Sequence, residues 1–504
     1  MIDPRRSIIV AAIVVSFASG AFAQEHGGRG SRPEQGRQEQ AGPGVLSLLP
    51  SDSVTEHVIE TPSGKLAYTA TAGTFSLFDQ SGERSAAVFY TAFVAKTKDP
   101  RRPLTFVFNG GPGAASAFLN LGLVGPRIAE FGADGRDGAD VRLIDNPDTW
   151  LAFTDLVAVD PVGTGWSRPA KPDGGSAFWG VHHDAESLAK VIALYVAKNG
   201  RVSSPKFILG ESYGGFRAAK VARALQSEQG IVPSGIIMVS PMLEGEFQFG
   251  GDRFALGAAL QLPSLIAAQL ERTGKFSKEA LAVAEHFALT DYLSMLAGPP
   301  PRGEAAQAFY ARVARMTGLP EDVVARSRGF IRDAYVKNLQ ATEHKIVSHY
   351  DATFAVDDPN PGNDGPRGPD PFLDGFIRGY GSAFVAYARD ELGFKTDMTY
   401  NLLASEISGK WDWHDGGGNA PPSIGEDLRV LLALTPSFRL MIAHGYSDMT
   451  TPFAVSRYVL DHIPTNVGEE RAELKLYRGG HMFYVDPQSR KAFTADARAH
   501  YAAP

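Results

Sequence analysis

The chain has 504 residues, with 49 Lys and Arg against 56 Asp and Glu, which gives a formal net charge of −7, and it contains no cysteine. A chain of this length with 44% hydrophobic residues can bury a large core, so we expect one sizeable α/β domain with an insertion. The mildly acidic balance argues against a nucleic-acid partner. The lack of cysteine excludes disulfide bonds within the chain.

The first residues have the pattern of a secretory signal peptide. Arg5 and Arg6 provide a positive start, and residues 7–20 form a short apolar run. Residues 21–23 (Ala-Phe-Ala) then resemble a cleavage site for small residues, so we expect cleavage after Ala23. The apolar run is shorter than the roughly 20 residues that span a bilayer, which argues against a stable membrane anchor. The segment therefore predicts an exported protein, either periplasmic or secreted.

The next segments predict a disordered leader followed by a β-rich start of the core. Residues 24–44 are rich in Gly, Gln, Arg and Glu and lack apolar periodicity, which is typical of disorder. Two β-rich runs within residues 65–96 flank a turn at residues 80–83 and predict a hairpin.

Strands and helices then alternate along the chain. We expect strands at 104–108, 156–160, 206–209 and 235–240, and helices at about 183–197 and 215–227. This alternation predicts an α/β fold with a mostly parallel central sheet flanked by helices. We place the first part of this core at residues 45–243.

A helical insertion is expected to interrupt the core. Helical patterns dominate residues 244–436, with segments at 264–273, 278–289 and 303–315. We interpret this region as a lid over the functional site. The core resumes at residues 437–504, where strand-like runs occur at 440–443 and 472–476.

Two features of the insertion have two interpretations each. Residues 357–370 are acidic and turn-rich; they could bind calcium, but the prolines and the missing terminal Glu favour a solvated loop. The aromatic pair Trp411 and Trp413 could line a substrate cleft or pack at the junction of lid and core.

The pattern Gly-x-Ser-x-Gly at residues 210–214 is the main chemical signal. It follows a short apolar strand and precedes a helical segment, which is the setting in which a strained turn exposes a nucleophilic serine. The helix N-terminus would face the negative charge that develops during acyl transfer. The alternative is a glycine-rich turn, but the flanking elements favour Ser212 as a nucleophile.

A serine nucleophile needs a histidine base and a carboxylate that orients it. Asp448 and His481 each follow a strand-like run and lie in a glycine-rich loop. The order Ser212, Asp448, His481 is the order in which hydrolases of this strand–turn–helix type carry their triad. Taken alone, Asp448 could be a turn residue and His481 a surface histidine, but together they predict a catalytic triad.

The loop at residues 109–113 (Asn-Gly-Gly-Pro-Gly) directly follows the predicted strand 104–108. Glycines at this place let backbone amides approach an oxyanion without a side-chain clash. We therefore predict the backbone amides of Gly111 and Tyr213 as the oxyanion hole.

One histidine pair could suggest a metal site. His182 and His183 precede Asp184 at the start of a predicted helix, but no third ligand with suitable spacing is evident. We therefore expect Asp184 to cap the helix and expect no metal and no cofactor.

The chain resembles the serine carboxypeptidases of the α/β-hydrolase superfamily, in particular bacterial members. Four blocks carry the resemblance in family order, namely residues 109–113, 160–167 (Asp-Pro-Val-Gly-Thr-Gly-Trp-Ser), 210–215 and 480–482. The resemblance implies removal of residues from peptide C-termini, with Asn109 and Glu211 as part of the site that binds the substrate carboxylate. A protonated Glu can donate a hydrogen bond to a carboxylate, and burial raises the pKa of a Glu.

The chain departs from this family at several positions. The family's tryptophan before the Asn is Val107, its second recognition glutamate is Leu123, and a Cys-Ser pair is replaced by Ala114 and Ala115. Arg127 could supply a cation in place of the glutamate, although a solvated surface arginine is the simpler interpretation.

The sequence as a whole predicts an exported serine carboxypeptidase that acts on peptides. The missing glutamate leaves an esterase or acyltransferase with the same triad as an alternative. A non-catalytic binding protein on a hydrolase scaffold is a second alternative, which the intact triad disfavours.

Overall fold

The computed structural model describes residues 44–97, 99–366, 368–414 and 420–502. The expected signal peptide and residues 24–43 of the expected leader lie outside the described residues. Within the described part of the chain, no helix is both long enough and apolar enough to cross a bilayer.

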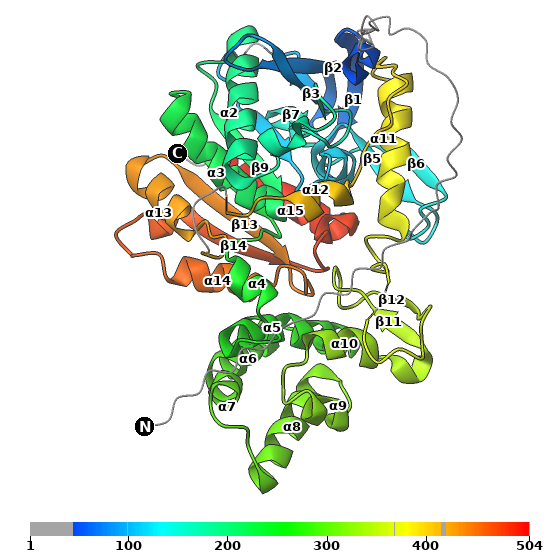
Figure 1. Cartoon of the computed structure of the whole chain (residues 1–504), viewed down its shortest axis with the longest axis vertical. Coiled ribbons are helices and arrows are strands. Elements are labelled where there is room, and N and C mark those ends of the chain that lie inside the picture. Colours follow the sequence, from blue (N-terminus) through cyan, green and yellow to red (C-terminus); the bar gives the residue numbers. More distant parts are fainter. Residues whose placement is uncertain (1–43, 98, 367, 415–419, 503–504) are drawn as a thin grey trace, which may run out of the picture. The chain divides into compact units, whose positions relative to one another are not determined.

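A mixed sheet of ten strands forms the centre of the described chain (Figure 1). In spatial order its strands are β1 (Ser53–Thr61), β2 (Gly64–Phe78), β3 (Arg84–Ala95), β7 (Asp155–Val159), β4 (Leu104–Phe108), β9 (Lys206–Glu211), β10 (Gly235–Val239), β13 (Arg439–Gly445) and β14 (Ala472–Tyr477), with β8 (Arg168–Pro169) paired to β3. The strands from β7 to β14 are parallel, and β1, β2 and β3 are antiparallel additions at one edge. The predicted α/β class and mostly parallel sheet are therefore confirmed.

Helices cover both faces of the sheet, because the central strands are apolar on both sides. Ile208 and Ile442 pack in one core with α2 (Val181–Lys198), α3 (Tyr213–Glu228) and α13 (Gly425–Leu434). Phe207 and Met441, their neighbours along the same strands, pack on the opposite face with α11 (Gly379–Asp390) and α15 (Pro487–Ala502).

The predicted strands and helices of the core are all present, and their observed ends differ from the predicted ends by no more than two residues. The hairpin expected within residues 65–96 is the pair β2–β3, joined by a turn at residues 79–83. The sequence did not indicate β1, whose outward-facing residues are exposed, or the separate hairpin of β5 (Arg127–Phe131) and β6 (Val141–Asp145).

The chain between β10 and β13 is mainly helical. Its elements are α4 (Gly245–Phe249), α5 (Ala255–Arg272), α6 (Lys278–Phe287), α7 (Leu293–Ala297), α8 (Gly303–Thr317), α9 (Glu321–Arg326), α10 (Arg332–Asn338), β11 (Lys345–Val347), β12 (Ala355–Asp357), α11 and α12 (Ser405–Lys410), before α13. The segment from α5 to β11 has an apolar core of its own. The helix predicted at 264–273 was too short, because α5 runs through Pro263 and starts at Ala255.

The two ends of this insertion lie side by side on the core. Glu244 and Ser423 form a backbone bridge, and the Ser423 hydroxyl donates to the Glu244 carboxylate at 2.8 Å. The N–H of Gly245 donates to the Pro422 carbonyl at 2.9 Å. Immediately after this crossing, α13 packs against α3.

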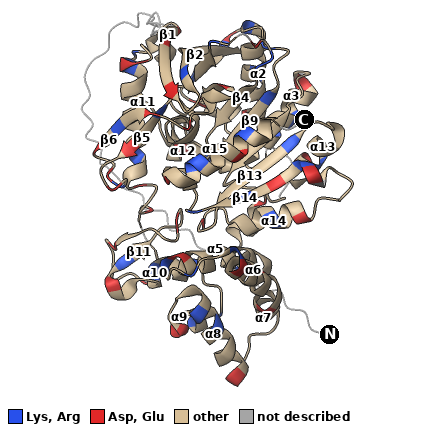
Figure 2. Cartoon of the chain, turned by 180° about the vertical axis from the view of Figure 1, so that it is seen from behind, with Lys and Arg blue, Asp and Glu red and all other residues tan. Residues whose placement is uncertain are grey.

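A second junction joins α5 to the loops that follow β13 and β14. The rings of Phe276 and Tyr446 stack with centroids 4.1 Å apart, and the Tyr446 hydroxyl donates to Glu271 at 2.9 Å. Glu271 also accepts a hydrogen bond from Arg478 at 2.5 Å. Figure 2 shows charged residues of both signs spread over the core and the helices of the insertion.

A buried ion pair ties α2 to α3, and it corrects one prediction. Asp184 does not cap α2, whose N-cap is Gly180; its carboxylate lies 2.6 Å from Nε of Arg217. The exposed fractions of the two side chains are 4% and 1%. Arg217 also donates to the backbone carbonyl of Asn109. The pair therefore connects both helices to the loop after β4.

We predict that Asp184→Asn lowers the free energy of unfolding by about 3 kcal/mol or more, because it leaves the buried Arg217 without its counter-charge. Denaturant unfolding followed by circular dichroism measures this change. Asp322→Asn is the matched control, because the pair of Asp322 with Arg326 is exposed on α9 and such pairs contribute about 0.5 kcal/mol. Equal losses in the two variants would contradict the prediction.

Candidate active site

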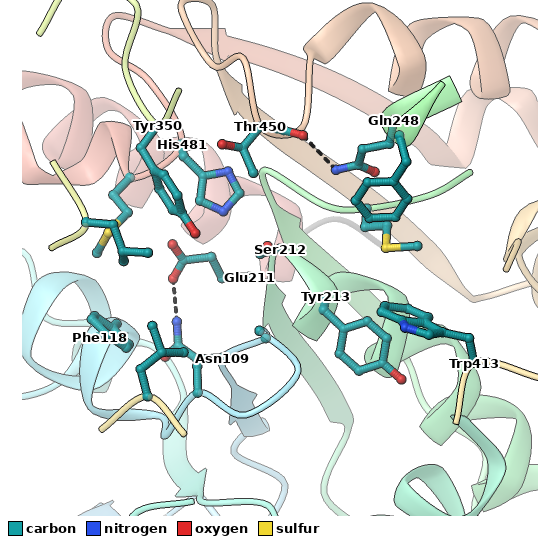
Figure 3. A pocket seen from close by; sticks show the side chains of 18 residues that line it. Asn109, Phe118, Glu211, Ser212, Tyr213, Gln248, Tyr350, Trp413, Thr450 and His481 are labelled. Atoms are coloured by element: carbon teal, nitrogen blue, oxygen red, sulfur yellow. Dashed lines mark hydrogen bonds between the residues drawn. The ribbon is translucent and has the colours of Figure 1, made fainter. Parts of the chain in front are cut away.

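A pocket opens where β4 and β9 end, and both the core and the insertion line it (Figure 3). Six of the predicted site residues line it directly: Asn109, Gly111, Glu211, Ser212, Tyr213 and His481. Asp448 lies behind His481 and is fully buried. The structure thus brings together residues that are up to 372 positions apart in the sequence, from Asn109 to His481.

Ser212 stands on a strained turn between β9 and α3. Its backbone angles are φ 60° and ψ −126°, a region that residues with a Cβ rarely adopt. The turn is compact: a Cβ on Gly210 would lie 1.9 Å from the Gly214 carbonyl oxygen, and a Cβ on Gly214 would lie 2.5 Å from that of Phe108. Only glycine fits at these two positions, which explains the Gly-x-Ser-x-Gly spacing.

The loop after β4 lies directly against this turn. A Cβ on Gly110 would lie 2.6 Å from the backbone nitrogen of Tyr213. Gly111, the next residue, has a φ of 99°, which favours glycine. The predicted donors Gly111 and Tyr213 therefore flank Ser212 on two segments that touch each other.

Asp448 and His481 form a buried hydrogen-bonded pair. Nδ1 of His481 lies 2.9 Å from Oδ2 of Asp448. The other oxygen of Asp448 accepts from the backbone N–H groups of Thr450 and Thr451, at 2.8 and 2.9 Å, and the Thr451 hydroxyl donates to Oδ2 at 2.6 Å. Burial lowers the pKa of His481, but the charge and the hydrogen bond of Asp448 outweigh burial and raise it above its ordinary value.

Glu211 and Asn109 also form a buried pair. Nδ2 of Asn109 donates to Oε2 of Glu211 at 2.5 Å, and Oδ1 of Asn109 accepts from the N–H of Leu119 at 3.0 Å. Burial raises the pKa of Glu211 to about 7, against the opposing effects of His481, Tyr484 and Asn109. The Glu211 carboxyl is therefore neutral in mildly acidic solution.

Several residues of the pocket were missed by the sequence analysis. Tyr350 comes from the insertion; its carbonyl accepts from the His481 N–H at 2.6 Å, and its ring lies 4.9 Å from the imidazole. Gln248, from α4, donates to the Thr450 carbonyl at 2.9 Å. No motif near either residue in the sequence indicates such a role, because they reach the pocket only through the folding of the insertion.

Of the two tryptophans of the insertion, one lines the pocket and the other packs at the junction with the core. Trp413 lines the pocket, and its ring lies 5.4 Å from that of Tyr213 (Figure 3). Trp411 is buried between the insertion and the core, with its ring 5.3 Å from Tyr213.

The positions that depart from the carboxypeptidase pattern lie mostly away from the pocket. Val107, Leu123 and Ala115 are buried in the core, while Ala114 lines the pocket. Arg127 forms ion pairs with Glu391 at 2.7 Å and Asp145 at 2.5 Å, outside the pocket lining. The interpretation of Arg127 as a cation in the site is therefore not supported.

No group of three or more His, Asp or Glu side chains in the described parts of the chain is placed to hold a metal ion. In the acidic loop, Asp358 pairs with Lys337 at 2.5 Å. Asp370 accepts from the Ser348 hydroxyl at 2.7 Å and from the N–H of His349 at 2.8 Å. These carboxylates therefore already have donors within the protein.

Residues 68–235 match the model of the serine carboxypeptidase family. No curated protein matches the chain. Among solved structures, Kex1, a prohormone-processing carboxypeptidase from Saccharomyces cerevisiae, is 14% identical with a TM-score of 0.53, over 86% of this chain and 91% of that chain.

Two other solved structures are less similar. A proline iminopeptidase from Mycobacterium smegmatis is 16% identical with a TM-score of 0.37, over 86% of this chain and 100% of that chain. A carboxyl esterase from Bacillus coagulans is 14% identical with a TM-score of 0.35, over 86% of this chain and 98% of that chain. The family match over residues 68–235 and the α/β-hydrolase fold together support a serine hydrolase, and the matched residues are similar to those of the serine carboxypeptidase family.

Proposed function

We propose that the chain is a serine-type carboxypeptidase that hydrolyses peptides at or near the C-terminus. The observation that carries this proposal is the buried carboxyl of Glu211, bonded to Asn109 in the pocket that Ser212 also lines. An enzyme that selects free C-termini needs a donor for a carboxylate beside its nucleophile. A neutral Glu211 provides such a donor, because a protonated carboxyl carries an O–H group.

The proposed reaction proceeds through an acyl-enzyme. Oγ of Ser212 attacks the carbonyl carbon of the scissile bond while Nε2 of His481 takes the hydroxyl proton. His481 then gives this proton to the leaving amine, the C–N bond breaks, and the acyl group stays on Ser212. A water molecule that loses a proton to His481 then attacks the ester, the C–O bond to Ser212 breaks, and His481 returns the proton to Oγ of Ser212 as the acid product leaves.

The remaining residues support these steps. Asp448 holds the Nδ1–H of His481, which leaves Nε2 free to accept a proton and stabilises the imidazolium that forms. The backbone N–H groups of Gly111 and Tyr213 donate to the oxyanion, and each such donor contributes a factor of about 10²–10³ in turnover. The reaction as proposed needs no cofactor.

An esterase or acyltransferase with the same residues is the second candidate. The observation that favours it is Leu123, which is buried in the core where the carboxypeptidase resemblance leads us to expect a second glutamate. Such an enzyme would use the triad in the same way but would not select a free carboxylate.

Ser212→Ala is expected to abolish hydrolysis and labelling by a fluorophosphonate probe, since it removes the nucleophile while the fold stays intact. Asp448→Asn is expected to lower kcat by about 10⁴, because the amide holds the wrong tautomer of His481. Steady-state kinetics on an N-blocked dipeptide measure both. Labelling that persists in Ser212→Ala would favour the alternative of a binding protein without this nucleophile. Near-normal kinetics for Asp448→Asn would mean that another residue has the role of the triad acid.

The ratio of kcat/KM for an N-blocked dipeptide with a free C-terminus to that for its C-terminal amide should depend on pH. Burial raises the pKa of Glu211 to about 7, so the carboxyl is protonated below that pH and repels the substrate carboxylate above it. We expect a ratio well above one at pH 5 that falls about tenfold per pH unit above pH 7. His481 acts on both substrates equally and cancels in the ratio. A ratio near one at every pH would favour the esterase or acyltransferase.

We also propose that the chain is exported and cleaved after Ala23; the support is the charge and apolar pattern of residues 5–23. N-terminal sequencing of the protein isolated from the periplasm or the medium should begin at Gln24. Changing Ala21 and Ala23 to bulky residues should leave the leader attached, because the cleavage site needs small side chains. Recovery of a chain that still begins at Met1 would refute this proposal.

A further inference from the structure

Glu211 has a second hydrogen-bond donor that the sequence analysis did not identify. The hydroxyl of Tyr484 donates to Oε2 of Glu211 at 2.8 Å. Oε2 is also the oxygen that accepts from Asn109, so both donors meet on one atom of the carboxyl. Tyr484 lies three residues after His481, in the short helical turn Phe483–Val485, and its exposed fraction is 0%.

This arrangement leaves the other oxygen of Glu211 available to a ligand. Across the described residues no protein group makes a hydrogen bond to Oε1, and Oε1 is not among the fully enclosed polar atoms without a partner. Glu211 lines the pocket and points into it from below His481 and Tyr350 (Figure 3). When the carboxyl is protonated, two donors on Oε2 force the proton onto Oε1, because an oxygen that carries a proton has less capacity to accept.

The Tyr484 ring occupies space beside the position of the missing glutamate. A Cβ on Gly122, the residue before Leu123, would lie 2.7 Å from Cε2 of Tyr484 and 2.7 Å from the hydroxyl of Tyr380. Gly122 therefore makes room for both rings. Leu123 itself is buried in the core with Tyr484.

We propose that Tyr484 is a positioning residue that takes over the part of the missing glutamate: with Asn109 it fixes Glu211 so that Oε1 presents its proton to the C-terminal carboxylate of a peptide. This inference rests on the proposed carboxypeptidase function and explains how a single glutamate, without a partner at position 123, can select a free carboxylate. A phenol suits this task because it donates a hydrogen bond and stays neutral throughout the working pH range.

The charges that act on Glu211 come from four directions. His481 and Asp448 lie on the loops after β14 and β13, Tyr484 lies on the turn that follows His481, and the hydroxyls of Tyr350 and Tyr380 come from the insertion. Of these groups, Asp448 carries a charge, and His481 carries one when it is protonated. The Tyr484 hydrogen bond stabilises the carboxylate form and so opposes the rise in pKa that burial causes.

The test compares Tyr484→Phe with the matched control Tyr380→Phe. Both changes remove one buried hydroxyl near Gly122, but Tyr484 is the one of the two that donates to Glu211. The measured quantity is the ratio of kcat/KM for the free-acid dipeptide to that for its amide, from pH 5 to 9. For Tyr484→Phe we expect the ratio at pH 5 to fall about tenfold, which is the loss that one hydrogen bond to a polar group can cause.

The pH profile gives a second readout, which a purely structural role would not change. Loss of the phenol removes a bond that stabilises the carboxylate, so the pKa of Glu211 rises and the ratio should fall at a higher pH, by about one unit. Tyr380→Phe should keep the wild-type ratio and profile. A ratio and a profile in Tyr484→Phe that match the wild type would overturn the proposal.

A fluorinated tyrosine at position 484 keeps the ring and the hydroxyl, which covers the case that Tyr484→Phe does not fold. Its hydroxyl is a stronger donor, so the fall of the ratio should move to lower pH, opposite to Tyr484→Phe; an unchanged profile would contradict the proposal. The wild-type ratio distinguishes failure of the proposed function from failure of this inference. A wild-type ratio near one rejects the carboxypeptidase function together with this inference. A high wild-type ratio that stays the same when Tyr484 is changed rejects this inference alone.

Discussion

The parallel pairing of β4 with β9 is the constraint on which the site depends. Its register sets Phe108 beside Gly210, so the next residues of both strands, Asn109 and Glu211, meet directly above the sheet. The same register brings Gly110 within contact of the start of α3, where no side chain could fit. A slip of this register would separate the acid pair and move the amides of the glycine loop away from Ser212. The apolar residues that alternate between the two faces of β9 fix the register through the cores on both sides.

Two buried carboxyl groups, Glu211 in the pocket wall and Asp448 behind His481, lie in different environments. Asp448 accepts four hydrogen bonds, from Thr450, Thr451 and His481, and these donors stabilise a negative charge. Glu211 has two neutral donors on one oxygen, and burial outweighs them and favours the protonated form. One carboxyl is thus suited to orient a base and the other to donate a hydrogen bond. This division follows from the number of donors, because both side chains are almost fully buried.

The sequence was sufficient where the information is local. Apolar runs and glycine spacing located β4, β9, α3 and the loops of Asp448 and His481, because each element is recognisable from a few neighbouring residues. It failed where a contact joins distant elements. Asp184 was interpreted as a cap although it pairs with Arg217, and the helix expected at 264–273 begins at Ala255 instead. Tyr350 and Tyr484 carry no motif, and their roles arise from folding the insertion and the last loop onto the pocket.

The neighbouring ends of the insertion, Glu244 and Ser423, have a consequence for the evolution of this scaffold. Because the chain leaves the core and returns to it at almost the same point, part of the intervening segment could be replaced by one of another length without displacing β10 or β13, provided that α11, which covers one face of the sheet, is kept. Such an exchange would keep the serine, the histidine and the acid pair but remove Tyr350 and Trp413 from the pocket wall. Chimeras joined at this point could therefore give new substrate preferences while the chemistry stays the same. In such chimeras the core would supply the proposed catalytic residues, and the exchanged segment would set the substrate preference.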